Sequence, residues 1–208
     1  MRIPEVPGTS HFTEHLVQAN GLDNGAFKEW VFCPGMLFQA NTQWWGDRGD
    51  RTTPHEGLDL CYYRDRDDRI QSLDHSTQIP AMCGGTVVGI IRDFLGLSLV
   101  LRHEISGDER RVFWTMYGHT DPKSEIQIGR VVREGETIAR LAHTRDSARV
   151  RAHLHLSIGL VPADFSFEGL DWSTIGDPEL VTLVDPLPAI GRSSVVPNTA
   201  LLECGRVA

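Results

Sequence analysis

The stretch His153-Leu154-His155-Leu156-Ser157-Ile158 decides the fold, because polar and apolar residues alternate strictly along it. On a helix, positions i and i+2 point about 200° apart, so two histidines at that spacing do not share one ion. On a strand they lie on one face, roughly 6.6 Å apart. The alternation therefore predicts a strand whose polar face carries His153, His155 and Ser157 and whose other face enters the core.

A second stretch, His55-Glu56-Gly57-Leu58-Asp59, repeats this design earlier in the chain. As a strand it would place His55 and Asp59 on one face, with Gly57 between them and Leu58 facing the core. A glycine at that position predicts space for an incoming ion or substrate.

A third strand is predicted for residues 112–119, which end in Tyr117-Gly118-His119. Regular alternation would put Phe113, Thr115 and Tyr117 on one face together with His119. The three strands would then present histidine and aspartate side chains on one surface of a sheet.

These motifs offer more metal-binding side chains than a single catalytic ion accepts from a protein. A catalytic zinc site keeps one position open for water and needs acid–base groups nearby, so the surplus predicts a hydrolytic centre. Two imidazoles and one carboxylate suit zinc better than other common ions. Spacing alone leaves open which histidines bind the metal. The five candidates are His55, Asp59, His119, His153 and His155.

The composition predicts a mainly β fold. The chain has 208 residues, of which 40% are hydrophobic, enough for one domain with a core, and its twenty glycines and eleven prolines favour short strands joined by turns. Further strands are predicted at 87–91 and 97–101, with a turn at 93–96 and a short helix at 12–20. A net charge of −8 argues against binding to nucleic acid, and no apolar run is long enough to span a membrane.

Three parts are expected along the chain: an N-terminal extension (1–35), one domain (36–190) and a C-terminal tail (191–208). The charged insertion 62–78 is predicted to be a solvated loop. The N-terminus lacks the features of a signal peptide, so the protein either stays inside the cell or begins after a removed leader. Cysteine spacing matches no zinc finger, and buried thiols are expected at Cys33, Cys61, Cys83 and Cys204.

Taken together, the motifs resemble those of the lysostaphin-type, or LytM-type, zinc metallopeptidases, which are peptidoglycan endopeptidases. In that family H-x-G-x-D, Y-x-H and H-x-H strands occur in the order found here. Two softer similarities are the family's G-T-V strand at 84–88 and its V-x-x-G-x-x-I hairpin at 131–138. The resemblance covers residues 36–190 and implies an antiparallel β-sheet enclosing a groove, with zinc on its floor.

The resemblance also implies a role for each residue. His55, Asp59 and His155 would bind Zn²⁺, while His153 and His119 would be the catalytic pair that polarises the attacking water and stabilises charge on the scissile carbonyl. The implied reaction is hydrolysis of a peptide bond in peptidoglycan stems or cross-links. The implied location is periplasmic or extracellular.

The sequence departs from the family at one position. Family members often carry an oxyanion-stabilising tyrosine a few residues before the first zinc histidine, and residues 47–51 contain none. Arg48 or Arg51 is the candidate replacement.

Three alternatives remain open at this point. A degenerate relative would keep the fold and regulate wall hydrolases by binding them. A peptidase of the same fold would act on a peptide outside the wall, such as glycine-rich protein. A biotinyl- or lipoyl-type carrier would use the 129–138 hairpin and require a modified lysine, for which Lys123 lacks the expected flanking residues.

Overall fold

The computed structural model describes residues 10–104, 110–143, 150–191 and 194–195. The helices are α1 (Phe12–Ala19) and α2 (Trp172–Ile175), with a 3₁₀ turn η1 (Pro34–Met36). The strands are β1 (Glu29–Val31), β2 (Leu58–Leu60), β3 (Tyr62–Arg64), β4 (Ile70–Ser72), β5 (Gln78–Pro80), β6 (Gly85–Arg92), β7 (Leu97–Glu104), β8 (Arg111–Pro122), β9 (Val131–Val132), β10 (Thr137–Leu141), β11 (Leu154–Pro162), β12 (Thr182–Val184) and β13 (Ser194–Val195).

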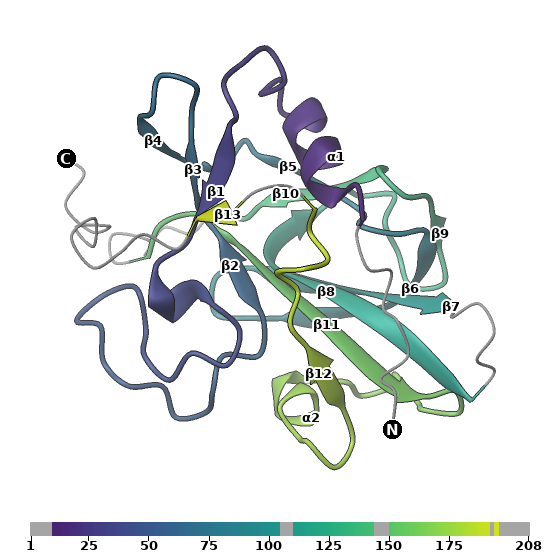
Figure 1. Ribbon diagram of the computed structural model, residues 1–208. Helices are drawn as coiled ribbons and strands as arrows, with labels where there is room; N and C mark the ends of the chain where they lie inside the picture. Colours follow the sequence, from purple (N-terminus) through teal and green to yellow (C-terminus); the bar gives the residue numbers. More distant parts are fainter. Residues whose placement is uncertain (1–9, 105–109, 144–149, 192–193, 196–208) are drawn as a thin grey trace.

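A large antiparallel sheet dominates the molecule, with its long strands β7, β8 and β11 crossing the centre of Figure 1. Its order is β12-β11-β8-β7-β6-β9, and β2 pairs with β11 while β10 pairs with both β8 and β5. A smaller sheet has the order β13-β1-β3-β4. Within the described part of the chain only β1 and β13 pair in parallel. The predicted mainly β, antiparallel fold is confirmed.

Apolar residues cover both faces of the central strands. Leu154, Leu156 and Ile158 of β11 are fully buried in the main core, as the alternation predicted. A second cluster on β8 includes Trp114 and Met116, and residues near α2 pack against it. Burial on both faces holds β8 and β11 rigidly, and the candidate site lies at their ends.

The N-terminal residues contribute to the same core. α1 forms where a helix was predicted, and Phe12 and Leu16 on its inner side are fully buried. The hydroxyl of Thr13 donates to the carbonyl of Ile190 at 2.7 Å and accepts from the indole of Trp30 at 2.9 Å. The predicted domain boundary after residue 35 stays a prediction, as does the tail 191–208, most of which lies outside the described residues.

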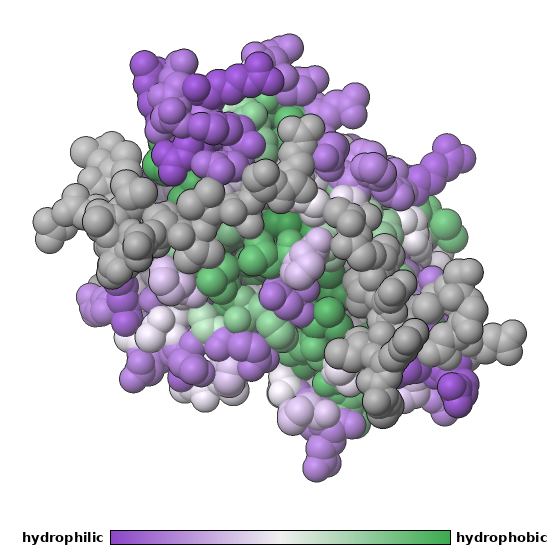
Figure 2. Space-filling model, viewed as in Figure 1, coloured by the Kyte–Doolittle hydropathy of each residue, from purple (hydrophilic) through white to green (hydrophobic). Residues whose placement is uncertain are grey.

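The charged insertion forms a hairpin, β3–β4, where a loop was predicted. Asp65 closes its turn by accepting hydrogen bonds from the backbone N–H groups of Asp67 and Arg69. Figure 2 shows hydrophilic residues gathered over this hairpin, so part of the segment is solvated as expected, whereas Tyr62, Tyr63 and Leu73 are buried in the main core. Residues 62–64 form a strand because they pair with β1, where Tyr62 lies opposite Val31, and so extend the small sheet.

The structure describes three of the four cysteines. Cys33 and Cys61 are buried, and Cys83 is a half-buried free thiol whose pKa burial raises to about 11. Cys204 lies outside the described residues.

No helix within the described ranges is long and apolar enough to cross a membrane.

Candidate metal centre

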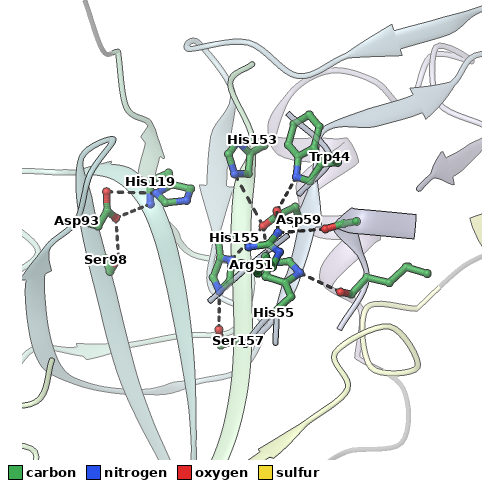
Figure 3. Close-up of polar contacts among 12 residues, drawn as sticks. Trp44, Arg51, His55, Asp59, Asp93, Ser98, His119, His153, His155 and Ser157 are labelled. Carbon is green, nitrogen blue, oxygen red and sulfur yellow. Dashed lines mark hydrogen bonds and ion pairs between the residues drawn. The ribbon is translucent and has the colours of Figure 1, made fainter. Parts of the chain in front are cut away.

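The pairing of β2 with β11 brings the first and last motifs together. Asp59 lies opposite His155 in this antiparallel register, so both side chains point to the same face. The ring of His55, which precedes β2, turns back toward both (Figure 3). One side-chain atom from each of the three lies within 4.8 Å of the others, and all three residues are buried.

The hydrogen bond that each ring makes on the side away from the cluster indicates which of its nitrogens carries the proton. Nδ1 of His55 lies 2.9 Å from the carbonyl oxygen of Leu37, which only accepts, so this nitrogen carries the proton and Nε2 offers a lone pair. Nε2 of His155 lies 2.8 Å from Oγ of Ser157, which can accept its proton, and the tautomer that donates there has a lone pair on Nδ1. A hydrogen bond from the distal ring nitrogen is the usual way in which a protein orients a metal-binding histidine.

The inward-facing atoms are close together. Nε2 of His55 lies 3.2 Å from Oδ1 of Asp59 and 3.1 Å from Nδ1 of His155, which is itself 3.0 Å from the same oxygen. A carboxylate oxygen and two ring nitrogens therefore converge on one point, where a shared proton or a bound cation offsets the repulsion between their electron pairs.

The charge states agree with a metal site. Burial lowers the pKa of His155, which keeps its ring neutral. Burial opposes ionisation of Asp59, but the nearby rings of His55 and His153 and hydrogen bonds from the histidines hold its pKa well below the ordinary range. Neutral imidazole and ionised carboxylate are the forms that bind zinc, so the residues fit this ion.

Gly57 serves a purpose other than the predicted one. A Cβ there would overlap the carbonyl oxygen of Leu156 and would lie 2.8 Å from Nε2 of His155 and 2.8 Å from Oγ of Ser157. The glycine therefore permits close packing of the His55 loop on β11. The predicted strand is also shorter than expected, because β2 begins at Leu58.

His119 reaches the site through an irregularity in β8. The prediction that it shares a face with Tyr117 is wrong: Tyr117 is fully buried, and its hydroxyl accepts from the backbone N–H of Met82 at 2.8 Å. The β7–β8 register shifts at this point, and His119 has a φ of 64°, which is uncommon for a residue other than glycine. The ring of His119 then lies 4.7 Å from that of His153, measured between centroids.

Asp93, which the sequence reasoning missed, fixes His119. Its Oδ2 accepts from the backbone N–H of His119 at 2.9 Å and from the hydroxyl of Ser98 at 2.7 Å, and its Oδ1 lies 3.2 Å from Nδ1 of His119. Burial alone would raise the pKa of Asp93, but these contacts lower it below the ordinary range. The turn at 93–96 was predicted, yet its contact with His119 is visible only in three dimensions.

His153 is the second histidine beside the metal-binding cluster. Its Nδ1 donates to the carbonyl of Arg151 at 2.8 Å, and its Nε2 lies 3.8 Å from Oδ1 of Asp59. Nε2 has no hydrogen-bond partner among the described residues. Burial lowers the pKa of His153 to about 4, so the ring is neutral near pH 7 and Nε2 is an available proton acceptor.

A cleft of about 460 Å³ opens over His55, Asp59, His119 and His155. Trp45, Phe94 and Trp172 form aromatic walls, and Phe94 is 67% exposed. Arg51 lines the cleft, whereas Arg48 is not among the lining residues. Besides Asp93, the roles of Trp172, Trp45 and Trp44 were not predicted; for Trp44 and Trp45, the signal available in the sequence was a pair of adjacent tryptophans shortly before the first motif.

An antiparallel sheet that brings together a buried His–Asp–His donor set and two further histidines defines a candidate metallohydrolase. Residues 69–163 match the family model described as peptidase family M23. This segment contains His119, His153 and His155, while His55 and Asp59 precede it. The resemblance to lysostaphin-type peptidases is confirmed.

Solved structures of similar proteins come from several bacteria. The catalytic domain of the prophage-encoded M23 protein EnpA from Enterococcus faecalis is 20% identical, with a TM-score of 0.37, covering 55% of this chain and 75% of that one. Helicobacter pylori Csd3 is 16% identical, with a TM-score of 0.44, covering 85% and 38%. The antimicrobial peptidase lysostaphin from Staphylococcus simulans is 19% identical, with a TM-score of 0.37, covering 64% and 42%. The chain thus spans less than half of Csd3 and of lysostaphin. No curated protein matches it.

Proposed function

We propose that the protein is a zinc-dependent endopeptidase that hydrolyses peptide bonds in peptidoglycan stems or cross-bridges. The observation that carries the proposal is the buried cluster in which one carboxylate oxygen of Asp59 and one ring nitrogen each of His55 and His155 lie within 3.2 Å of one another. These three residues would hold Zn²⁺. The M23 match supports a peptidase, and the wall substrate is inferred from the family.

Bound zinc would supply a Lewis acid that lowers the pKa of water to about 7. His153 lies beside the metal ligands with an unpartnered Nε2, and it would accept the proton of the attacking water at this atom. Its ring is kept in place by the carbonyl of Arg151 and by Trp45, whose ring is stacked on it at an interplanar angle of 27°.

His119 would stabilise the negative charge that develops on the scissile carbonyl oxygen. Oδ1 of Asp93, 3.2 Å from Nδ1, orients the ring so that Nε2–H is able to donate to an anionic oxygen. Because the same carboxylate also accepts the backbone N–H of His119, ring and backbone are fixed together. Such preorganisation is what electrostatic stabilisation of a transition state requires.

The cleft suits an extended peptide. Its aromatic lining, Trp45 and Phe94 among it, offers apolar contact beside the candidate metal centre, and Thr52 and Thr53 add polar groups to the lining. Hydrolysis of wall peptides would place the protein in the periplasm or outside the cell.

Digestion of purified peptidoglycan tests the proposal. Walls of several cross-link chemistries are incubated with the zinc-loaded protein, and the released fragments are identified by mass spectrometry. Fragments with new peptide termini are expected, and they should disappear with a chelator and with His153→Ala. If the zinc-loaded protein releases nothing from any wall but cleaves glycine-rich peptides, the wall substrate is wrong and the peptidase remains. If it cleaves neither, the enzymatic proposal is wrong.

A further inference from the structure

One carboxylate oxygen of the candidate ligand Asp59 accepts a hydrogen bond from a residue that is not a candidate metal ligand. Oδ1 faces His55 and His155, while Oδ2 accepts a hydrogen bond of 2.7 Å from the indole N–H of Trp44. Nη2 of Arg51 lies 3.7 Å from the same Oδ2. Figure 3 shows the Trp44 ring pointing its nitrogen at the carboxylate. The two oxygens of one side chain therefore have different environments.

Trp44 and Arg51 belong to one loop, residues 41–51, which is closed on itself. Its ends are joined by a β-bridge between Thr42 and Asp50, and the backbone N–H of Arg51 donates to the carbonyl of Asn41 at 2.8 Å. The Arg51 guanidinium also donates to the carbonyls of Gly35, at 3.1 Å, and Thr42, at 3.3 Å. Both donors are thus held by contacts that do not involve Asp59.

The indole is also fixed by its surroundings. Trp44 is 6% exposed, and its ring meets those of Tyr62 and His153 edge to face. A buried indole has one N–H and needs one acceptor, which here is Oδ2. Rotation of the Asp59 carboxylate away from Trp44 would leave this buried N–H without an acceptor, which is unfavourable.

We propose that Trp44 is a positioning residue that restricts Asp59 to a single oxygen, Oδ1, for metal binding, with Arg51 facing the same reserved oxygen. The inference rests on the metal site of the proposed function. A carboxylate free to turn would offer both oxygens to an ion and fill the position that a catalytic zinc leaves to water. Hydrogen bonds to ligands of this kind typically change metal affinity by about 10- to 100-fold.

The test replaces the donor and keeps the ring. Trp44→Phe removes the N–H, and Trp44→3-benzothienylalanine exchanges it for sulfur in a ring of nearly the same shape. Trp114 with the same two replacements is the matched control, because it lies in the second apolar cluster and its buried indole N–H has no hydrogen-bond acceptor among the described residues. Zinc affinity is measured by competition with a chromophoric chelator, and coordination is followed by the visible absorption of the cobalt(II)-loaded protein.

Both changes at position 44 are expected to weaken zinc binding by about 10- to 100-fold. They should also weaken the cobalt bands, since a second carboxylate oxygen raises the coordination number above four. The control should match the parent in both readouts. The isosteric variant decides the matter if Trp44→Phe does not fold.

Two results would overturn the inference: unchanged affinity and spectrum in the isosteric variant, or an equal loss in the corresponding variant of Trp114, which would indicate packing alone. A parent protein that takes up neither zinc nor cobalt would instead overturn the metal site itself. The failure of the inference and that of the proposed function are therefore distinguishable.

Discussion

Replacing Gly57 with alanine tests the packing of the site more sharply than replacing a ligand. The new methyl group would overlap the Leu156 carbonyl and press on the His155 ring and the Ser157 hydroxyl. Backbone of a central strand does not yield as a flexible side chain would, so the His55 loop has to move. Overpacking of this kind costs about 1–3 kcal/mol. Displacement of a ligand would further weaken zinc binding by at least about 10-fold.

The matched control is Gly49→Ala, because a Cβ at Gly49 would meet nothing within 4 Å. Urea unfolding of the metal-free proteins gives the free energies of unfolding, and chelator competition gives zinc affinities. We expect Gly57→Ala to lose stability even without metal and Gly49→Ala to match the parent. If Gly57 only left space for an ion or substrate, as its position in the sequence predicted, the metal-free variant would be as stable as the parent. That result would refute the packing argument.

Three further predictions concern catalysis, acid stability and metal removal. His153→Gln should retain zinc while peptide hydrolysis falls by about 10²- to 10⁴-fold, the usual contribution of a general base; zinc analysis beside a rate assay checks this, and an active variant would exclude His153 as the base. Burial holds the pKa of His103 at about 4, below its ordinary 6.5. The unfolded chain therefore binds a proton at His103 at a higher pH than the folded protein does, and stability falls as the pH drops from about 6.5 to 4. The loss is up to about 3 kcal/mol, and denaturant titrations at pH 7 and 4 should show a smaller loss in His103→Gln; an identical loss would contradict the assignment. Zinc at 100 times its Kd should stabilise the protein by about 2.7 kcal/mol, so a chelator should lower the Tm of the parent and leave that of Asp59→Ala unchanged.

Alternation along the chain was sufficient to predict the strand that carries His155 and the core face of Leu154 and Leu156. It also predicted that the first and last motifs would meet, and β2 does pair with β11 in the register His155–Asp59. These features follow from local pattern, because the two-residue period of a strand fixes which side chains share a face. The mainly β, antiparallel fold class was predictable for the same reason.

Features that depend on irregular backbone or on distant contacts were not predictable. The alternation assigned His119 to the face of Tyr117, but the register shift in β8 reverses it. Asp93 and Trp44 come from a turn and a loop, where no periodicity relates a side chain to its partner. The close approach that requires Gly57 depends on β11, about a hundred residues away in sequence.

The central claim is that His55, Asp59 and His155 bind the metal while His153 acts beside it. The most direct measurement is the zinc content of the parent, Asp59→Ala and His153→Ala proteins after loading and exhaustive dialysis, with circular dichroism to establish folding. About one equivalent of zinc is predicted in the parent and in His153→Ala, and almost none in folded Asp59→Ala. Zinc retained by Asp59→Ala, or lost equally from both variants, would contradict the account.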